Sequence, residues 1–254
     1  MLSPAQIDQA AQHLIAARKS NTRGALIPES ARPKDNDSAL AIQTRTLELL
    51  GETTGGWKCG LPRPDGSLVV SPIPASAILR ASPCAVPEER GQIEPEIAFV
   101  MARDLPAREA LYSQDEIRAA VGEARMALEL LGSRYANGAA ATPLDVLADS
   151  FNNVGLLVGP LVENVYSRPL EKLHVKVTSE GSTLFDAECA HPSGHPLKSL
   201  TWLVHFLQQR GGGLRAGQVI TTGSYPGIVE APIGPPLLIE LGGVGAIETR
   251  LIAA

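Results

Sequence analysis

The sequence predicts an α+β fold in which a small helical N-terminal region precedes a larger domain built on a mixed β-sheet, rolled or sandwiched. The first fifty residues carry two runs in which apolar residues recur at helical spacing. From residue 68 onward, short runs rich in β-branched residues alternate with glycine and proline, which is typical of strands and turns. We therefore expect an N-terminal helical cap over residues 1–70 and the sheet domain over residues 71–254.

Two helices are predicted in the cap. The first begins with Ser3 as N-cap and Pro4 at the first helical position, and its apolar residues recur through Ile15. The second spans residues 38–50 and ends at Gly51. The intervening residues 23–37 are polar and contain two prolines, so we expect a loop there.

The strands of the sheet domain follow from short apolar runs bounded by turn residues. In chain order we expect them at residues 57–59, 68–70, 93–101, 126–131, 154–158, 173–177, 183–187, 219–222, 237–241 and 246–252. Glu180 and Gly181 predict a hairpin turn between 173–177 and 183–187, residues 88–91 predict a turn, and the glycines at 242–245 predict another hairpin.

Two or three helices are expected to interrupt these strands, and two of them can be placed. Ser113 and Glu116 form a capping-box pattern ahead of a helix over residues 114–121. A second helix is expected over residues 196–209 and ends at a run of three glycines, 211–213.

Composition excludes several classes of protein. The chain has 254 residues and a net charge of −5, without a basic run, which argues against a nucleic-acid-binding protein. No apolar stretch approaches the ~18 residues of a membrane span, and the N-terminus lacks the pattern of a secretion signal. Three widely spaced cysteines without a C-x-x-C pair predict reduced thiols and a cytoplasmic protein, with Cys59 a buried strand residue rather than a nucleophile.

Three glutamates stand out in this apolar context. Glu94 and Glu96 lie two apart on a predicted strand and therefore project from the same face. Glu129 lies within an aliphatic run, where an unpaired buried carboxylate is costly. One hard divalent cation shared by all three would compensate these charges, and oxygen ligands favour Mg²⁺ or Mn²⁺.

A plainer interpretation stays open on spacing alone. Glu94 and Glu96 could lie on a solvated strand face and pair with lysine or arginine, and Glu129 could belong to an amphipathic helix. His191 and His195 are predicted to be structural, because neither has a third ligand at metal-binding spacing and His195 precedes Pro196 at a helix start.

Several segments together resemble the 2-hydroxypenta-2,4-dienoate hydratase and 4-oxalocrotonate decarboxylase family of the fumarylacetoacetate hydrolase superfamily. The matching pieces, ordered along the chain from about residue 40, are 57–61 (WKCGL), 93–98 (IEPEIA), 103–106 (RDLP), 127–134 (ALELLGSR), 194–197 (GHPL) and 216–223 (AGQVITTG). The resemblance implies a catalytic domain of the fumarylacetoacetate hydrolase type and a homo-oligomer. It also implies that Glu94, Glu96 and Glu129 hold Mg²⁺ or Mn²⁺ and that Lys58 lies in the active site.

The sequence departs from the family pattern at two places. The family carries a longer loop with an acidic pair where this chain has the shorter stretch 62–74, and the acidic pair is missing. Asp65 lies in that stretch, but an aspartate before glycine is more typical of a turn. A serine that the family uses near the substrate falls at about Asn153.

The resemblance implies a metal-dependent hydratase that adds water to a 2-hydroxy-2,4-dienoate, or to its 2-oxo-4-enoate form, in aromatic-compound catabolism. A decarboxylase of the 4-oxalocrotonate type and a non-catalytic partner subunit are the alternatives. Lys58 would supply positive charge or a proton, or else form a plain salt bridge. Asn153 and Thr222 are expected to bind the substrate carboxylate and Gly223 to contact it through the backbone, although strand propensity also explains Thr222.

Overall fold

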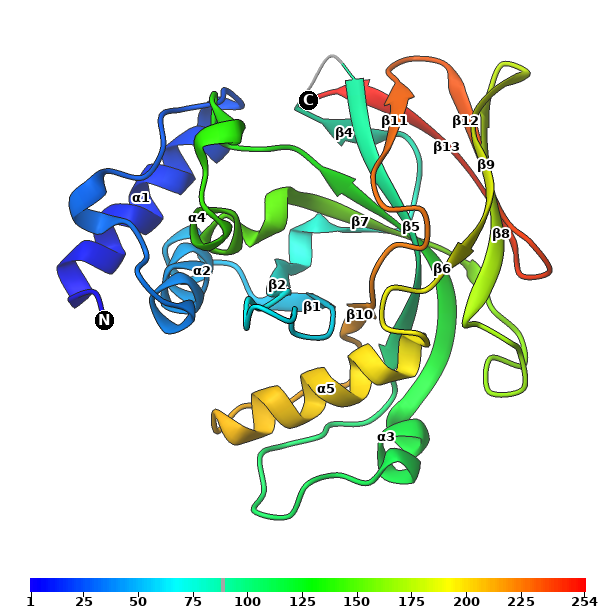
Figure 1. Cartoon of the computed structure of the whole chain (residues 1–254), viewed down its shortest axis with the longest axis horizontal. Coiled ribbons are helices and arrows are strands. Elements are labelled where there is room, and N and C mark those ends of the chain that lie inside the picture. The colour runs from blue at the N-terminus through cyan, green and yellow to red at the C-terminus, as the bar shows by residue number, and fades with distance from the viewer. Residues whose placement is uncertain (88–89) are drawn as a thin grey trace.

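The computed structural model describes residues 1–87 and 90–254 (Figure 1). Three helices form a layer at one side, shown at the left of Figure 1: α1 (Pro4–Ser20), α2 (Asn36–Leu50) and the short α4 (Pro143–Ala148). Leu14, Ile42 and Leu147 from these helices belong to one buried apolar cluster. The two predicted N-terminal helices are confirmed, and the capping box of Ser3 and Gln6 explains where the first begins.

An eight-stranded mixed sheet forms the centre of the molecule. Its order is β2 (Val70–Pro74), β1 (Thr54–Cys59), β10 (Val219–Thr221), β5 (Arg90–Met101), β6 (Val121–Leu131), β7 (Asn153–Leu161) and β3 (Ile78–Leu79), with β11 (Val229–Pro232) also paired to β5. The neighbours β1 and β10 are parallel, whereas β10, β5, β6 and β7 are successively antiparallel. Five strands from distant parts of the chain thus lie side by side, in the order β1, β10, β5, β6 and β7.

A second sheet of five strands packs beside the first. Its order is β4 (Cys84–Val86), β13 (Gly245–Ala253), β12 (Pro236–Leu241), β8 (Lys172–Ser179) and β9 (Ser182–Ala190). The hairpin from β8 to β9 turns through Glu180 and Gly181, whose φ angles of 48° and 81° are those a two-residue hairpin turn requires. This hairpin and the one from β12 to β13 are therefore confirmed.

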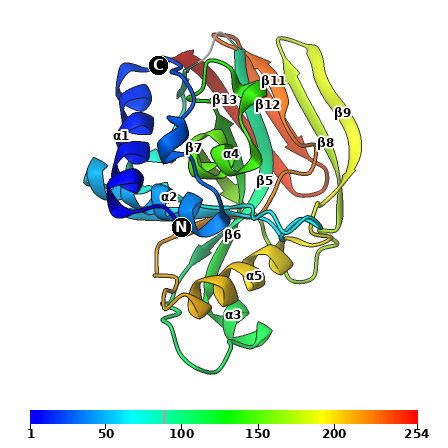
Figure 2. The same ribbon diagram turned by 60° about the vertical axis from the view of Figure 1, so that its left-hand side comes forward.

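The main core lies between the sheets and α5 (Pro196–Gln209). Phe99 and Leu128 of the first sheet, Val175 and Ile239 of the second, and Leu203 of α5 belong to one buried cluster. The remaining helix, α3 (Gln114–Ala120), lies next to α5 at one end of the sheets in both views (Figures 1 and 2). Its predicted capping box between Ser113 and Glu116 is present. Short 3₁₀ turns occur at Glu29–Ala31, Ala75–Ala77, Gly138–Ala140 and Ser150–Asn152.

One strand lies at other residues than predicted, and three short strands were not predicted. The strand expected at residues 68–70 lies at Val70–Pro74, and its two prolines are tolerated because β2 is an edge strand that pairs with β1 alone. The short strands β3, β4 and β11 were not expected, since two to four residues carry little periodic signal. Glu88 and Glu89 of the predicted turn at 88–91 lie outside the described residues.

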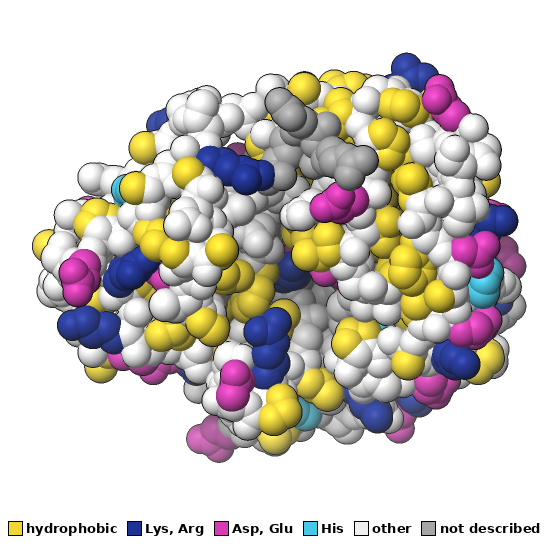
Figure 3. Space-filling model, turned by 45° about the horizontal axis from the view of Figure 1, so that its top comes forward, with side chains coloured by type: hydrophobic (Ala, Val, Ile, Leu, Met, Phe, Trp, Pro, Cys, Tyr) yellow, Lys and Arg dark blue, Asp and Glu magenta, His cyan; other side chains and the backbone are white. Residues whose placement is uncertain are grey.

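The predicted α+β class is confirmed. β1 joins the large sheet from within residues 1–70. Among the described residues, no helix is long and apolar enough to cross a membrane. The surface in Figure 3 intersperses charged side chains of both signs with hydrophobic ones over the helical layer and the sheets.

Candidate metal centre and active site

Three carboxylates converge on one face of the large sheet. Glu94 of β5 lies directly opposite Glu129 of β6 in the strand register, and Glu96 follows on the same face of β5. One oxygen from each of the three side chains lies within 4.8 Å of the others. Because like charges directly opposite each other destabilise a sheet, this cluster requires a compensating positive charge.

Lys58 on β1 supplies part of that charge. Its Nζ lies 2.7 Å from Oε1 of Glu129 and 3.8 Å from Oε2 of Glu94. Burial lowers the pKa of Lys58, but the two carboxylates outweigh it and hold that pKa above its usual value. One ammonium group cannot balance three carboxylates, so a deficit of positive charge remains.

The raised pKa values of Glu94 and Glu96 reflect this deficit. Burial raises the pKa of Glu94 to about 7. The charge of Lys58 opposes this shift, and the charge of Glu129 adds to it. Burial and the other two carboxylates hold the pKa of Glu96 well above its usual range. In the protein alone, the surroundings of Glu94 and Glu96 therefore favour protons on these two carboxylates, and a bound cation would displace those protons.

The described residues provide donors to one oxygen of Glu129 and not to the other. Oε1 of Glu129 accepts from Asn153 Nδ2 at 2.8 Å as well as from Lys58. Oε2 of the same fully buried side chain has no donor among the described residues. A buried carboxylate oxygen without a donor, facing two further carboxylates, fits a divalent cation, and an all-oxygen set suits Mg²⁺ or Mn²⁺.

Glu96 is held by the strand on its other side. Its Oε2 accepts from the backbone N–H of Gly223 at 2.6 Å and from the hydroxyl of Thr221. Lys58, Thr221, Glu96, Glu129 and Asn153 thus lie on five neighbouring strands, β1, β10, β5, β6 and β7. The sheet order, not proximity in sequence, assembles the site.

A cavity of about 500 Å³ opens over this cluster. Lys58, Glu94 and Glu96 form its charged end, and much of the remaining wall is apolar. The other lining residues are Cys59, Gly60, Leu61, Pro62, Arg63, Pro64, Val69, Phe151, Pro192, Ser193, Gly223 and Ser224. A few polar groups at one end of an apolar pocket of this size are typical of a site for a small organic molecule.

Phe151 enters the cavity from a strained segment. Ser150, Phe151 and Asn152 all have positive φ, at 57°, 52° and 61°, a conformation that non-glycine residues rarely adopt. The Phe151 ring lies 5.6 Å from Nζ of Lys58. Strain of this kind persists where the surrounding structure holds it, and it often occurs at functional sites. The residue that follows this segment is Asn153.

Buried Arg134 anchors that segment at both ends. Its backbone N–H donates to Oδ2 of Asp149 at 3.2 Å, and its Nε lies 3.5 Å from Oδ1 of the same side chain. The guanidinium also donates to the backbone carbonyl of Asn153. Nothing in the local sequence pattern identified Phe151 or Arg134 as parts of the site.

Comparison with known proteins defines the family. Residues 56–251 match the family model described as fumarylacetoacetate (FAA) hydrolase, C-terminal. The chain belongs to the fumarylacetoacetate hydrolase family. A 2-keto-4-pentenoate hydratase of Paraburkholderia xenovorans is 26% identical over 98% of this chain and 96% of that protein. A 4-oxalocrotonate decarboxylase of Pseudomonas putida is 27% identical over 54% of this chain and 52% of that protein.

Solved structures of the fumarylacetoacetate hydrolase family share the fold. The 4-oxalocrotonate decarboxylase from Pseudomonas putida G7, complexed with magnesium and adipate, matches with a TM-score of 0.81 and 20% identity over 99% of both chains. The fumarylpyruvate hydrolase from Pseudomonas aeruginosa, in complex with Mn²⁺ and pyruvate, matches with a TM-score of 0.56 and 14% identity over 78% of this chain and 89% of that one. The predicted family and fold type are thereby confirmed.

The residues predicted to bind substrate have defined partners in this family member. Asn153 and Gly223 both reach the cluster, where they donate to Glu129 and Glu96. The Thr222 hydroxyl donates to the Ile97 carbonyl at 2.7 Å, and its side chain is fully buried. Neighbouring strand residues project to opposite faces, so it is Thr221 that lies beside Glu96 and donates to it. No role was predicted for Thr221. Contact of Asn153, Thr222 or Gly223 with substrate stays a prediction.

The remaining predicted residues have structural roles. His195 caps α5, with its Nδ1 accepting from Leu197 N–H at 3.1 Å, and His191 is buried against Tyr225. Cys59 is buried, and burial raises the pKa of its thiol well above the usual value, so it is a poor nucleophile. Exposed Asp65 accepts from Ser67 N–H at 2.9 Å, as a turn residue does.

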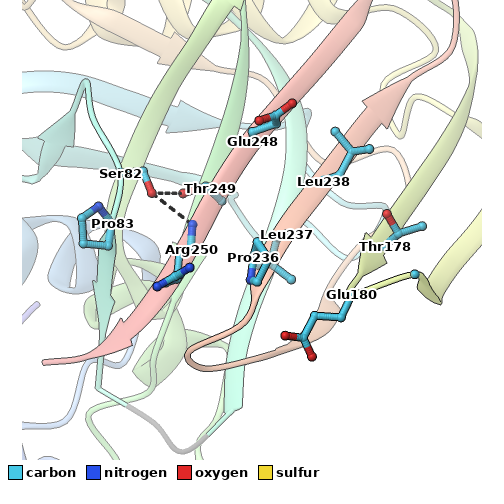
Figure 4. Close-up of a pocket in the computed structure, with 11 residues that line it drawn as sticks. Ser82, Pro83, Thr178, Glu180, Pro236, Leu237, Leu238, Glu248, Thr249 and Arg250 are labelled. Carbon is cyan, nitrogen blue, oxygen red and sulfur yellow. Dashed lines mark hydrogen bonds between the residues drawn. The ribbon is translucent and has the colours of Figure 1, made fainter.

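Another cavity, of about 650 Å³, lies against the five-stranded sheet (Figure 4). None of its lining residues belongs to the eight-stranded sheet. Ser82 there accepts from the Thr249 hydroxyl at 3.2 Å and from Arg250 N–H at 3.1 Å, so its hydroxyl serves to join two chain segments.

Proposed function

We propose that this chain is a divalent-metal-dependent hydratase that adds water to a 2-hydroxy-2,4-dienoate, or to its 2-oxo-4-enoate form, in aromatic-compound catabolism. The observation that carries the proposal is the buried Oε2 of Glu129, which lies beside Glu94 and Glu96 and has no donor among the described residues. These three carboxylates would hold Mg²⁺ or Mn²⁺. The similar hydratases named above, which span nearly the whole chain, support the reaction class.

A bound cation would act as a Lewis acid that stabilises an enolate-like state of a 2-oxo acid. Lys58 holds its proton on Nζ between Glu129 and Glu94, at the charged end of the cavity, and would supply that proton or its positive charge to the developing anion. Asn153 fixes Glu129, and the N–H of Gly223 fixes Glu96, so that both carboxylates keep their orientation. Phe151 and Pro192 line the cavity beside this charged end.

A 2-oxo acid decarboxylase of the 4-oxalocrotonate type is the second candidate. The stretch 62–74 lacks the acidic pair that the resemblance leads us to expect in a hydratase, while the three glutamates that both activities need are present. The same missing pair motivates a third candidate, a non-catalytic partner subunit with this fold.

Product analysis separates these candidates. Purified protein is mixed with freshly generated 2-hydroxypenta-2,4-dienoate, with added Mg²⁺ or Mn²⁺ and again with excess chelator, while absorbance is followed and the product is identified by mass. We expect metal-dependent decay with gain of one water. Loss of CO₂ from 4-oxalocrotonate without hydration of the dienoate would establish the decarboxylase instead. Inactivity on both substrates would favour the partner subunit.

We also infer a cytoplasmic homo-oligomer with a helical cap over residues 1–70 and a catalytic domain over residues 71–254. Three free cysteines support a reducing compartment. Light scattering coupled to size-exclusion chromatography measures the oligomeric state, and a mass equal to one chain would contradict the oligomer.

A further inference from the structure

The part of the cavity wall that the connection from β1 to β2 contributes contains one unexpected charge. The connection from β1 to β2 contributes Leu61, Pro62, Pro64 and Val69, which are apolar. Arg63 projects from the same connection and is, with Lys58, one of two cationic residues among those that line the cavity.

The two cations differ in what they already bind. Lys58 is engaged by Glu129 and Glu94. No carboxylate of the described residues lies within 4.0 Å of a side-chain nitrogen of Arg63. The nearby Asp65 uses its Oδ1 to accept from Ser67 N–H, and this hydrogen bonding lowers the pKa of Asp65, with the charge of Arg63 contributing from a distance beyond salt-bridge contact. The guanidinium of Arg63 is therefore available to an anion in the cavity.

The backbone around Arg63 is held in a tight turn. Arg63 N–H donates to Ser67 O at 2.9 Å, and Gly66 N–H donates to Arg63 O at 2.9 Å, with Gly66 at a φ of 82°. Asn36 Nδ2 at the start of α2 donates to Gly66 O at 3.2 Å, which ties the turn to the helical layer. Hydrogen bonds of the turn thus fix the backbone of Arg63 beside the cavity.

We propose that Arg63 binds a second, distal carboxylate of the substrate, so that the site prefers a 2-oxo or 2-hydroxy dioate to the matching monocarboxylate. This inference rests on the proposed function, because it takes the 2-oxo acid end of the substrate to lie at the glutamate cluster. The carbon chain then lies along Leu61, Pro62 and Phe151, and the distal carboxylate meets the guanidinium. The planar fork of arginine matches a carboxylate with two parallel hydrogen bonds.

Binding of a non-reactive pair tests the proposal without relying on turnover. The ligands are 2-oxoadipate and 2-oxohexanoate, which share a six-carbon chain and differ in the distal carboxylate, and affinity is measured by calorimetry with Mg²⁺ present. We expect wild-type protein to bind 2-oxoadipate about tenfold more tightly than 2-oxohexanoate, because one charge-assisted hydrogen bond near solvent contributes about that much affinity. Arg63→Leu should abolish this preference and leave 2-oxohexanoate binding within about twofold, and Arg63→Lys should retain part of it.

The control variant is Arg103→Leu, which removes an exposed arginine that does not line the cavity and should keep the full preference. Equal affinity of the wild-type protein for both acids, or an unchanged preference in Arg63→Leu, would overturn the role of Arg63. A parallel turnover assay with 2-hydroxypenta-2,4-dienoate and its six-carbon dioate counterpart tests the reaction separately. Selective binding without turnover would contradict the proposed hydratase while supporting Arg63 as the selecting residue.

Discussion

The side-chain amide of Asn153 donates to Oε1 of Glu129 at 2.8 Å, the same oxygen that Lys58 binds at 2.7 Å. Two donors on one oxygen leave Oε2 of this buried carboxylate without a donor among the described residues. The orientation of Glu129 toward Glu94 and Glu96 is therefore set from the side opposite to the proposed cation. Residues that orient a ligand in this way contribute to affinity without touching the metal.

Replacing Asn153 should weaken cation binding. In Asn153→Ala the Glu129 carboxylate loses its neutral donor and can rotate, so we expect Mn²⁺ affinity to fall about 10- to 100-fold, measured by electron paramagnetic resonance or calorimetry. Asn153→Ser, which keeps a shorter donor, should show a smaller loss. Asn137→Ala, at an exposed asparagine outside the site, is the matched control. Unchanged Mn²⁺ affinity in Asn153→Ala would show that Glu129 is held by Lys58 alone.

Replacing Glu94 should have opposite effects on binding and on stability. Glu94→Gln removes one proposed ligand, so stabilisation by Mg²⁺ should be lost. It also removes a like charge directly opposite Glu129, so the metal-free variant should be more stable than metal-free wild type by about 1 kcal/mol at pH 8. Thermal unfolding with chelator and with Mg²⁺ measures both effects, with Glu248→Gln on β13 as control. A metal-free variant less stable than wild type would contradict the repulsion argument.

Lys58 should matter to rate more than to metal binding. Lys58→Met keeps much of the stem but removes the ammonium group at the charged end of the cavity. We expect kcat to fall at least about 100-fold, as loss of a proton-transfer group typically causes. Mn²⁺ affinity should stay the same or increase, because a competing cation near Glu129 is gone. A wild-type kcat in this variant would remove Lys58 from the mechanism and leave it a plain salt-bridge partner.

The strained turn at Phe151 predicts an unusual order of stabilities. Glycine adopts left-handed φ without the steric penalty that alanine incurs, so Phe151→Gly should be more stable than Phe151→Ala by about 1 kcal/mol. At ordinary helical or strand positions the order is the reverse. Chemical denaturation measures the difference, and both variants should lose activity as water reaches Lys58. Should alanine prove the more stable substitution, Phe151 would not hold a left-handed conformation in solution.

The sequence predicted those parts of the site that depend on local periodicity. Glu94 and Glu96 share a face because strand residues alternate, and no knowledge of partners was needed. The contact of the Thr221 hydroxyl with Glu96 was not predicted, because it depends on how β10 is aligned with β5. The left-handed Phe151 was missed because tertiary contacts around Arg134, not residue type, hold that backbone. Long-range register and strain are properties of the folded chain and carry no short-range signal.

Buried His191 should make stability depend on pH. Burial lowers its pKa from 6.5 to about 4, so between these values the unfolded chain binds a proton that the folded protein does not. Stability contributed by the neutral ring is fully present above pH 6.5 and is lost as pH falls, by about 3 kcal/mol at pH 4. His191→Asn keeps an acceptor for Ser193 N–H but does not titrate there. We therefore expect the difference in unfolding free energy between wild type and His191→Asn to be constant above pH 7 and to shrink below pH 6.5. Titrating groups that do not interact with His191 contribute equally to both proteins, whereas the charge of nearby His195 adds to the lowering of the His191 pKa. Parallel curves down to pH 4 would mean that His191 is protonated as readily in the folded protein as in the unfolded chain.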